Sequence, residues 1–246
     1  MQPTRPRFCI AGGGIAGALL AWRLARHGGS SVTLLDDPAE PGATAVSGGL
    51  ARGYEPDRHN AQLATRSLAE LAGSDRLPQL RRTGSVYVCQ GAPDRATVAG
   101  IGRAVGGVSV AGPDELAGRF GLAGVPSGCL AVVERQAGYL SPAQLAAAAR
   151  QQAARLGVRL RSGRLAGCES SRDGVWYVLA DGRVGRADGL VLATGAWTPG
   201  LLAAAGLPAN GLRTKLIRYT EFAAKGQLPP AFVDEPTGLY GRPTAD

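Results

Sequence analysis

The sequence has 246 residues, an apolar content of 45% and a formal net charge of +8 at pH 7. A chain of this length can bury a substantial core, in one large domain or two ordinary ones. No run is long and apolar enough to span a bilayer, so we expect no membrane association. The charge comes almost wholly from dispersed arginines, which argues against a nucleic-acid partner.

The cysteines predict a reduced, cytoplasmic protein without a metal site. Cys9, Cys89, Cys129 and Cys168 are scattered, with no CxxC pair and no metal-ligand spacing. The apolar stretch over residues 8–22 follows two arginines and superficially resembles a secretory signal. Its three consecutive glycines are poor in such a helix, so we interpret the stretch as part of the folded protein.

Residues 7–36 predict a βαβ unit. A short apolar run over 8–11 stops at three glycines, and helical spacing of apolar residues then continues to Gly28. A second apolar run over 32–35 ends on Asp36. Strand, glycine turn, helix and strand in this order are typical of a dinucleotide-binding unit.

The glycines fit the GxGxxG pattern of that unit. Gly12 permits the tight turn, Gly14 lets backbone approach a pyrophosphate, and Gly17 lets the helix pack closely on the sheet. The helix N-terminus offers free N–H groups to the phosphates. Asp36 follows about 20 residues after Gly17, where a carboxylate can accept ribose hydroxyls and would repel a 2′-phosphate. The pattern therefore favours a dinucleotide other than NADP; a glycine-rich turn of another α/β protein is the alternative.

The rest of the chain predicts further elements in order. Helices are expected over residues 59–71, 94–106, from 113, and over 142–157, with Ser141 as an N-cap rather than a nucleophile. Asp181-Gly182 predicts a hairpin turn. Strands are expected at residues 84–89, 129–133, 158–160, 165–168, 175–179, 188–193, 216–222 and 239–242.

Four segments together resemble the D-amino-acid-oxidase-like superfamily of flavoproteins, which includes glycine and sarcosine oxidases. They are the glycine unit with Asp36, the Ser47-Gly48-Gly49 loop, the helix after Ser141 with the strand at Leu165, and Ala193-Thr194-Gly195-Ala196-Trp197. The resemblance implies an α/β fold: a Rossmann-like FAD-binding domain over 1–80 and 138–205, with an inserted, incomplete mixed-sheet substrate domain over 81–137 and 206–246.

The same resemblance implies FAD, bound non-covalently because no cysteine obviously occupies a covalent attachment position. It places the pyrophosphate on residues 12–17, the ribose on Asp36 and the adenine beside the backbone at Leu165. The implied cofactor residues are Gly12, Gly14, Ile15, Ala16, Gly17, Asp36, Ser47, Gly48, Gly49, Leu165, Thr194, Gly195 and Trp197.

The implied reaction is oxidation of the C–N bond of an amine or amino acid by hydride transfer to flavin, with oxygen or another acceptor reoxidising the flavin. Tyr240 matches a family position that faces substrate, although a strand tyrosine packed in a sheet is an equal alternative. Arg52 could hold a substrate carboxylate bidentately, and a surface arginine is the alternative. His27 and His59 are interpreted as structural.

The sequence stops at Asp246, where members of the superfamily continue for about 100 residues, the size of a further domain. We expect a fragment, or a short member whose site is completed by a second copy or a partner chain. Two alternatives stay open for the function: another FAD enzyme class, such as a hydroxylase or reductase, and a non-catalytic flavin-binding module.

Overall fold

The computed structural model describes residues 5–37, 39, 41–223 and 228–244. The chain divides into two compact units, residues 1–47 with 142–219 and residues 48–141 with 220–246. Each unit is therefore built from two separate stretches of chain around its own sheet. The domain ranges expected from the sequence differ from these units mainly at residues 48–80, which group with the second unit, and at residues 206–219, which group with the first.

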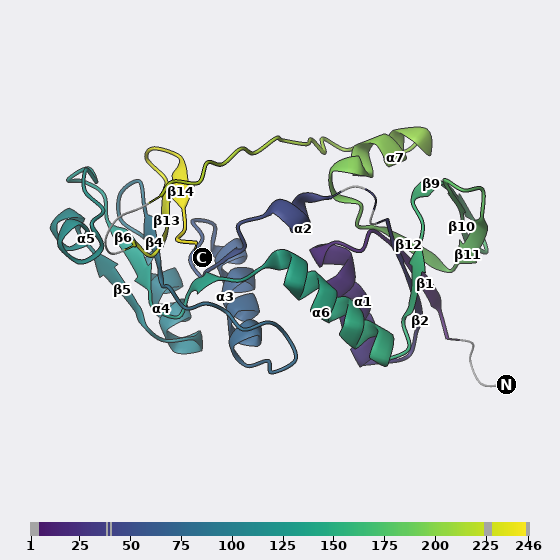
Figure 1. The fold of residues 1–246 in the computed structure, drawn as a ribbon, viewed down its shortest axis with the longest axis horizontal. Coiled ribbons are helices and arrows are strands. Elements are labelled where there is room, and N and C mark those ends of the chain that lie inside the picture. The colour runs from purple at the N-terminus through teal and green to yellow at the C-terminus, as the bar shows by residue number, and fades with distance from the viewer. Residues whose placement is uncertain (1–4, 38, 40, 224–227, 245–246) are drawn as a thin grey trace. The chain divides into compact units, whose positions relative to one another are not determined.

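The first unit is built on a four-stranded parallel sheet in the order β12-β1-β2-β8, of which Figure 1 labels the first three strands. Its strands are β1 (Arg7–Ala11), β2 (Ser31–Asp36), β8 (Arg159–Ser162) and β12 (Gly189–Leu192). Cys9, Ile10 and Ala11 in β1 are almost wholly buried. A central parallel strand is covered on both faces, which explains why its sequence is a continuous apolar run.

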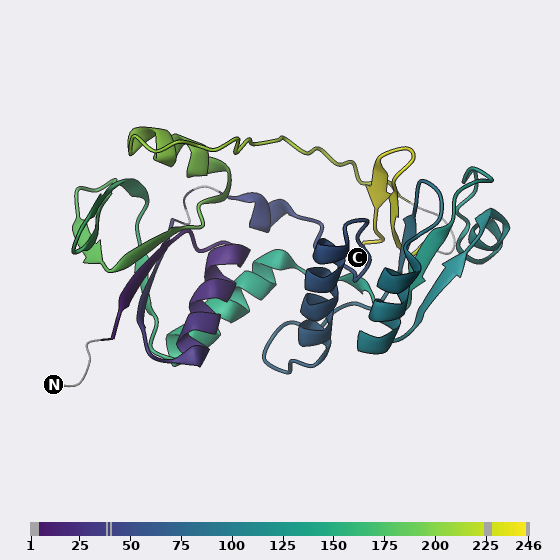
Figure 2. The ribbon, with the colours of Figure 1, turned by 180° about the vertical axis from the view of Figure 1, so that it is seen from behind.

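Helices α1 (Ile15–His27) and α6 (Pro142–Arg155) lie side by side in this unit, as both views show (Figures 1 and 2). Their contact is made by the buried side chains of Ala18, Ala146 and Ala149. Methyl groups at the contact let the two backbones approach closely. The predicted βαβ unit and the predicted helix after Ser141 are both confirmed.

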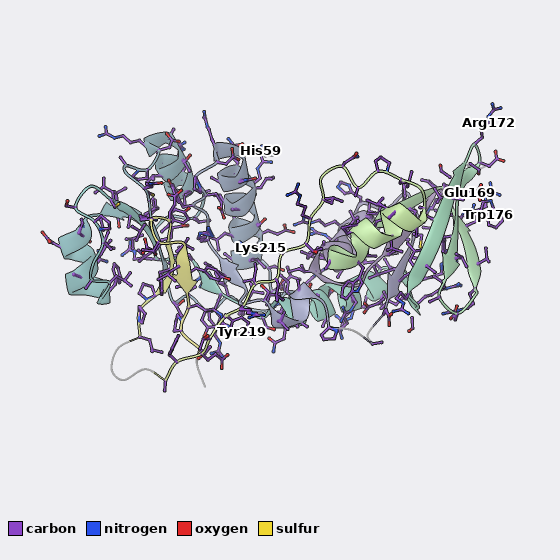
Figure 3. All side chains as sticks on the ribbon, turned by 90° about the horizontal axis from the view of Figure 1, so that it is seen from above. His59, Glu169, Arg172, Trp176, Lys215 and Tyr219 are labelled. Atoms are coloured by element: carbon purple, nitrogen blue, oxygen red, sulfur yellow. The ribbon has the colours of Figure 1, made fainter. Side chains whose placement is uncertain are left out.

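A three-stranded antiparallel sheet also belongs to the first unit, in the order β11-β10-β9. Its strands are β9 (Leu165–Ser171), β10 (Gly174–Leu179) and β11 (Val184–Ala187). Gly182 turns between the last two with a φ of +83°, as the Asp-Gly pair predicts. One face contributes Leu165 and Leu179 to the core around β1, whereas Trp176 is about half exposed (Figure 3).

After β12 the chain forms the single turn η1 (Gly195–Trp197) and helix α7 (Thr198–Ala204), followed by a segment without regular structure. The predicted strand at 216–222 is wrong. Leu216 and Phe222 are 77% and 85% exposed, and no described strand pairs with this segment. Figure 3 labels Tyr219 within it. High β propensity is not sufficient, because a strand also needs a neighbour to satisfy its backbone.

The second unit contains a five-stranded mixed sheet in the order β14-β13-β4-β6-β5. Its strands are β4 (Ser85–Val88), β5 (Val108–Ala111), β6 (Ala131–Glu134), β13 (Ala231–Asp234) and β14 (Leu239–Gly241). β13 runs parallel to β4, and the other pairs are antiparallel. The expected second, mixed sheet is confirmed, although β13 itself was not predicted.

Three helices belong to the second unit: α3 (Arg58–Ala72), α4 (Arg95–Ala104) and α5 (Pro113–Phe120). The carboxylates of Asp57 and Asp94 cap the first two by accepting backbone N–H groups of the first turn. A two-stranded ribbon joins β3 (Leu50–Ala51) to β7 (Gly138–Tyr139). None of the helices in the described part of the chain combines the length and apolarity needed to cross a bilayer.

Candidate functional site: a dinucleotide cradle and an arginine-centred cluster

The glycine turn after β1 is closed by backbone on two sides. Gly12 has a φ of +109°, and a Cβ placed on it would overlap the carbonyl group of Ala193. A Cβ on Gly17 would overlap the carbonyl oxygen of Gly12. A side chain at either position would therefore push the turn away from α1 or from the end of β12. This is the close approach that the GxGxxG spacing predicts.

The backbone N–H groups at the N-terminus of α1 have few hydrogen-bond acceptors near this turn. Gly14 is the N-cap and makes no side-chain capping bond. The N–H of Ile15 donates to the hydroxyl of Thr44, 3.1 Å away, and Ala16 is exposed. The helix dipole and the remaining N–H groups make this end suitable for an anion such as a pyrophosphate.

Asp36 ends β2 beside the turn. A Cβ on Gly13 would overlap the Asp36 carboxyl group, so the bare glycine is what lets this side chain lie against the loop. The Asp36 side chain is 37% exposed, and its Oδ2 lies 3.5 Å from Nη1 of Arg150. An exposed carboxylate held here can accept hydrogen bonds from ribose hydroxyls.

The other residues predicted around the cofactor in this unit come from three separate segments. Leu165 is buried at the start of β9 in the core shared with β1. The Thr194 hydroxyl lies 2.9 Å from that of Thr198, and Gly195 has a φ of +55°. Trp197 is 45% exposed, with its ring edge 3.4 Å from where a Cβ on Gly42 would be. Ser47 follows the short helix α2 (Ala43–Val46), which was not predicted.

Gly48 and Gly49 open the second unit beside Arg242. A Cβ on Gly48 would lie 3.5 Å from Nε of Arg242. The Arg242 guanidinium stacks over the Tyr139 ring, 4.3 Å from the ring centroid, and its buried Nε has no hydrogen-bond partner. The carbonyl of Gly49, whose φ is +67°, accepts the N–H of Leu140 at 3.1 Å. The loop therefore presents bare backbone next to a cation.

Arg52 is part of a partly buried cluster in the second unit and is not a surface arginine. Its side chain is 14% exposed and stacks on Tyr87 with 5.1 Å to the ring centroid. Its Nη2 pairs with Glu55 Oε1 at 3.0 Å, while its buried Nε has no hydrogen-bond partner. The edge of the guanidinium formed by Nε and Nη2 is therefore only partly used in hydrogen bonding.

A buried carboxylate fixes the backbone that follows Arg52. The two oxygens of Glu134, which is 1% exposed, accept the N–H groups of Gly53 and Tyr54 at 2.8 Å each. Burial raises the pKa of Glu134, although the two N–H groups and Arg52 act in the opposite direction. Burial also raises the pKa of Tyr54, whose hydroxyl lies 3.4 Å from Cys89 Sγ.

Tyr240 lies on β14, at the edge of the mixed sheet, and is 56% exposed. The structure therefore does not show Tyr240 packed within the sheet, which was the alternative.

Cys9, Cys89 and Cys129 are buried free thiols, and Cys168 is partly buried. Burial raises the pKa of Cys9 and of Cys89, which makes both thiols poor nucleophiles. The described residues contain no group of three or more acidic, histidine or cysteine side chains that could hold a metal ion.

Sequence reasoning missed three residues of these clusters: Thr44, Glu134 and Arg150. Each is linked to its partner across many residues of sequence, and none belongs to a motif with fixed spacing. Glu134 gave a weak signal, because a charged residue directly after the apolar run over 129–133 must be paired if the strand is buried.

The chain matches the family described as FAD dependent oxidoreductase over residues 7–246. The chain belongs to this family. The glycine cradle, the helix N-terminus and the partly exposed Asp36 carboxylate fit the adenosine and pyrophosphate of FAD, because a bare backbone turn, the positive end of a helix dipole and a carboxylate at the end of β2 are the groups that bind such a dinucleotide. The family and the cradle agree on a Rossmann-like FAD-binding fold.

Solved structures share the fold at low sequence identity. L-proline dehydrogenase from P. horikoshii is 20% identical with a TM-score of 0.71, covering 97% of this chain and 67% of that one. NikD, described as an unusual amino acid oxidase, is 22% identical with a TM-score of 0.60, covering 80% and 53%. Fructosyl amine:oxygen oxidoreductase from Aspergillus fumigatus is 22% identical with a TM-score of 0.59, covering 82% and 51%. No curated protein matches the chain.

Proposed function

We propose that this chain forms the FAD-binding part, and some of the substrate-binding part, of an enzyme that oxidises the C–N bond of an amine or amino acid. The chain matches about half the length of NikD and of the Aspergillus enzyme, so the proposal concerns the activity of the whole protein. The observation that carries it is the cradle of Gly12, Gly17 and Asp36 in a chain of this family.

The first unit would hold the cofactor non-covalently. Gly12, Gly14 and the N-terminus of α1 would bind the pyrophosphate, and Asp36 would bind the ribose. Three of the four thiols are buried, which supports a non-covalent cofactor. FAD would supply the electron-pair acceptor for oxidation of the carbon that bears the nitrogen.

The second unit would contribute to substrate binding. Arg52 would bind the carboxylate of an amino acid through its guanidinium group, in place of its present partner Glu55. Tyr240 would face the substrate from the edge strand β14. The similar structures are those of a proline dehydrogenase, an amino acid oxidase and a fructosyl amine oxidoreductase, which supports a substrate with an oxidisable C–N bond.

The test is reduction of the bound flavin by candidate substrates under anaerobic conditions, followed by its absorption. We expect amino acids or secondary amines to bleach it without NAD(P)H, and peroxide to form if oxygen is the acceptor. Bleaching by NAD(P)H and not by any amine would assign the chain to another FAD enzyme class. A flavin that neither type of reductant reduces would indicate a binding module that needs a partner chain.

A further inference from the structure

We propose that Arg150 is a positioning residue of the cofactor site, holding Asp36 and the glycine loop in the arrangement that binds an adenosine diphosphate. Arg150 lies on α6, far along the chain from the glycine motif, and it was not among the residues predicted to bind the cofactor. The inference rests on the cofactor part of the proposed function and does not depend on the substrate.

The position of Arg150 follows from the packing of α6 on α1. Ala146, Ala149 and Ala153 are buried, with exposures of 1% or less, and their spacing places them on one face of the helix. Arg150 is one turn beyond Ala146 and so projects along the same contact. Because the contact is made of methyl groups, the helix backbones are close enough for this side chain to reach the loop at the start of α1.

One guanidinium nitrogen contacts both parts of the site. Nη1 of Arg150 donates to the carbonyl oxygen of Gly13 at 2.5 Å and lies 3.5 Å from Oδ2 of Asp36. The Arg150 side chain is 31% exposed, so these contacts are only partly screened by water. Arg150 therefore links the carboxylate proposed to bind ribose to the loop proposed to bind pyrophosphate.

The bond to Gly13 has a geometric consequence for the next residue. In a trans peptide the carbonyl and the following N–H point in opposite directions. Holding the Gly13 carbonyl towards Arg150 therefore directs the N–H of Gly14 away from α6. This N–H is one of the loop donors available to a pyrophosphate at the start of α1.

The contact with Asp36 has a second consequence. The Asp36 carboxyl group lies where a side chain on Gly13 would be, and Arg150 is paired with it. Without Arg150, this carboxylate would lose the contact that orients it, and its negative charge close to the proposed pyrophosphate site would be less compensated. Both effects would weaken the binding of an adenosine diphosphate.

The experiment measures binding of ADP and of FAD to the full 246-residue chain by titration calorimetry. ADP carries the ribose and the pyrophosphate without the flavin, so the readout is independent of activity. The variant is Arg150→Met, which keeps the length of the side chain and removes its charge and donors. The matched control is Arg155→Met, an exposed arginine in the last turn of the same helix.

We expect Arg150→Met to weaken ADP and FAD binding by about ten- to a hundredfold, the scale of a lost hydrogen bond from a charged group. Arg155→Met should change it less than about twofold. Arg150→Lys should recover part of the affinity, because an ammonium group can still donate to one of the two oxygens. The melting temperatures of the ligand-free variants should match that of the control, which separates positioning from general stability.

The coupling to Asp36 is tested by a double-mutant cycle with Asp36→Asn. If Arg150 acts through Asp36, the double variant should lose less affinity than the two single losses combined. Losses that simply combine, or an Arg150→Met variant that binds like the control, would overturn the inference while leaving the cofactor site intact. A wild-type chain that binds neither ADP nor FAD would overturn both the inference and the proposed function.

Discussion

Glu134 offers a direct test of how the second unit is held together. Its buried carboxylate accepts two consecutive N–H groups, of Gly53 and Tyr54, from a segment about 80 residues away. Replacement by alanine leaves both donors buried without an acceptor. Each orphaned donor costs about 1–3 kcal/mol, so Glu134→Ala should destabilise the protein by about 2–6 kcal/mol. Glu134→Gln keeps one acceptor oxygen and should cost about 1–3 kcal/mol.

The assay is urea unfolding, followed by two probes. Labelling of the buried Cys89 thiol reports on the cluster around Glu134, whereas Trp22, Trp176 and Trp197 all lie in the first unit and report on it by fluorescence. We expect the labelling transition to move to lower urea in both variants, and further in Glu134→Ala. The control Glu115→Gln removes an exposed helical pair with Arg119, worth about 0.3–0.5 kcal/mol. A Glu134→Ala variant that unfolds like this control would refute the reasoning.

Three further predictions follow from the same contacts. Gly17→Ala should abolish FAD retention and lower the unfolding free energy by at least about 1–3 kcal/mol, because the added methyl group overlaps the Gly12 carbonyl. The control Gly100→Ala, in an open stretch of α4, should be neutral or stabilising in the same unfolding assay. Arg52→Lys should raise KM for an amino acid by about tenfold or more, and it should leave kcat and the turnover of amines without a carboxylate little changed. Equal losses for both substrate types would contradict the role of Arg52 in binding a carboxylate. Burial raises the pKa of Glu134 above its ordinary value of 4.5, so the folded state holds the Glu134 proton more tightly than the unfolded state does. The stability that this proton contributes should be present below pH 4.5 and be lost as the pH rises through the folded-state pKa. A Glu134→Gln variant whose stability has the same pH profile would argue against this.

The first unit could be predicted largely because its signals are local. The glycine motif, the change from strand to helix spacing and the position of Asp36 all fall within 30 residues, and the structure confirms the βαβ unit they predict. The Asp181-Gly182 turn and the helix from Pro142 are local signals of the same kind. In each case the conformation of a few neighbouring residues decides the element.

The remaining elements and contacts were harder to predict, in both units, because long-range pairing decides them. Residues 216–222 have high β propensity but no described strand beside them, and they are not a strand. The four residues of β13 follow two prolines, which favour a loop, yet they pair in parallel with β4. Glu134 and Arg150 are invisible to motif reasoning for the same reason, since their partners are known only once the chain is folded.

The measurement that tests the central claim most directly is the flavin content of the purified 246-residue chain. The cradle of Gly12, Gly17 and Asp36 lies wholly within the first unit, so we predict an oxidised-flavin absorption band that stays with the protein through gel filtration. Acid precipitation should release this flavin as FAD into the supernatant. A colourless chain that gains no flavin when FAD is supplied would contradict the account, because the residues assigned to the cofactor would then not suffice to bind it.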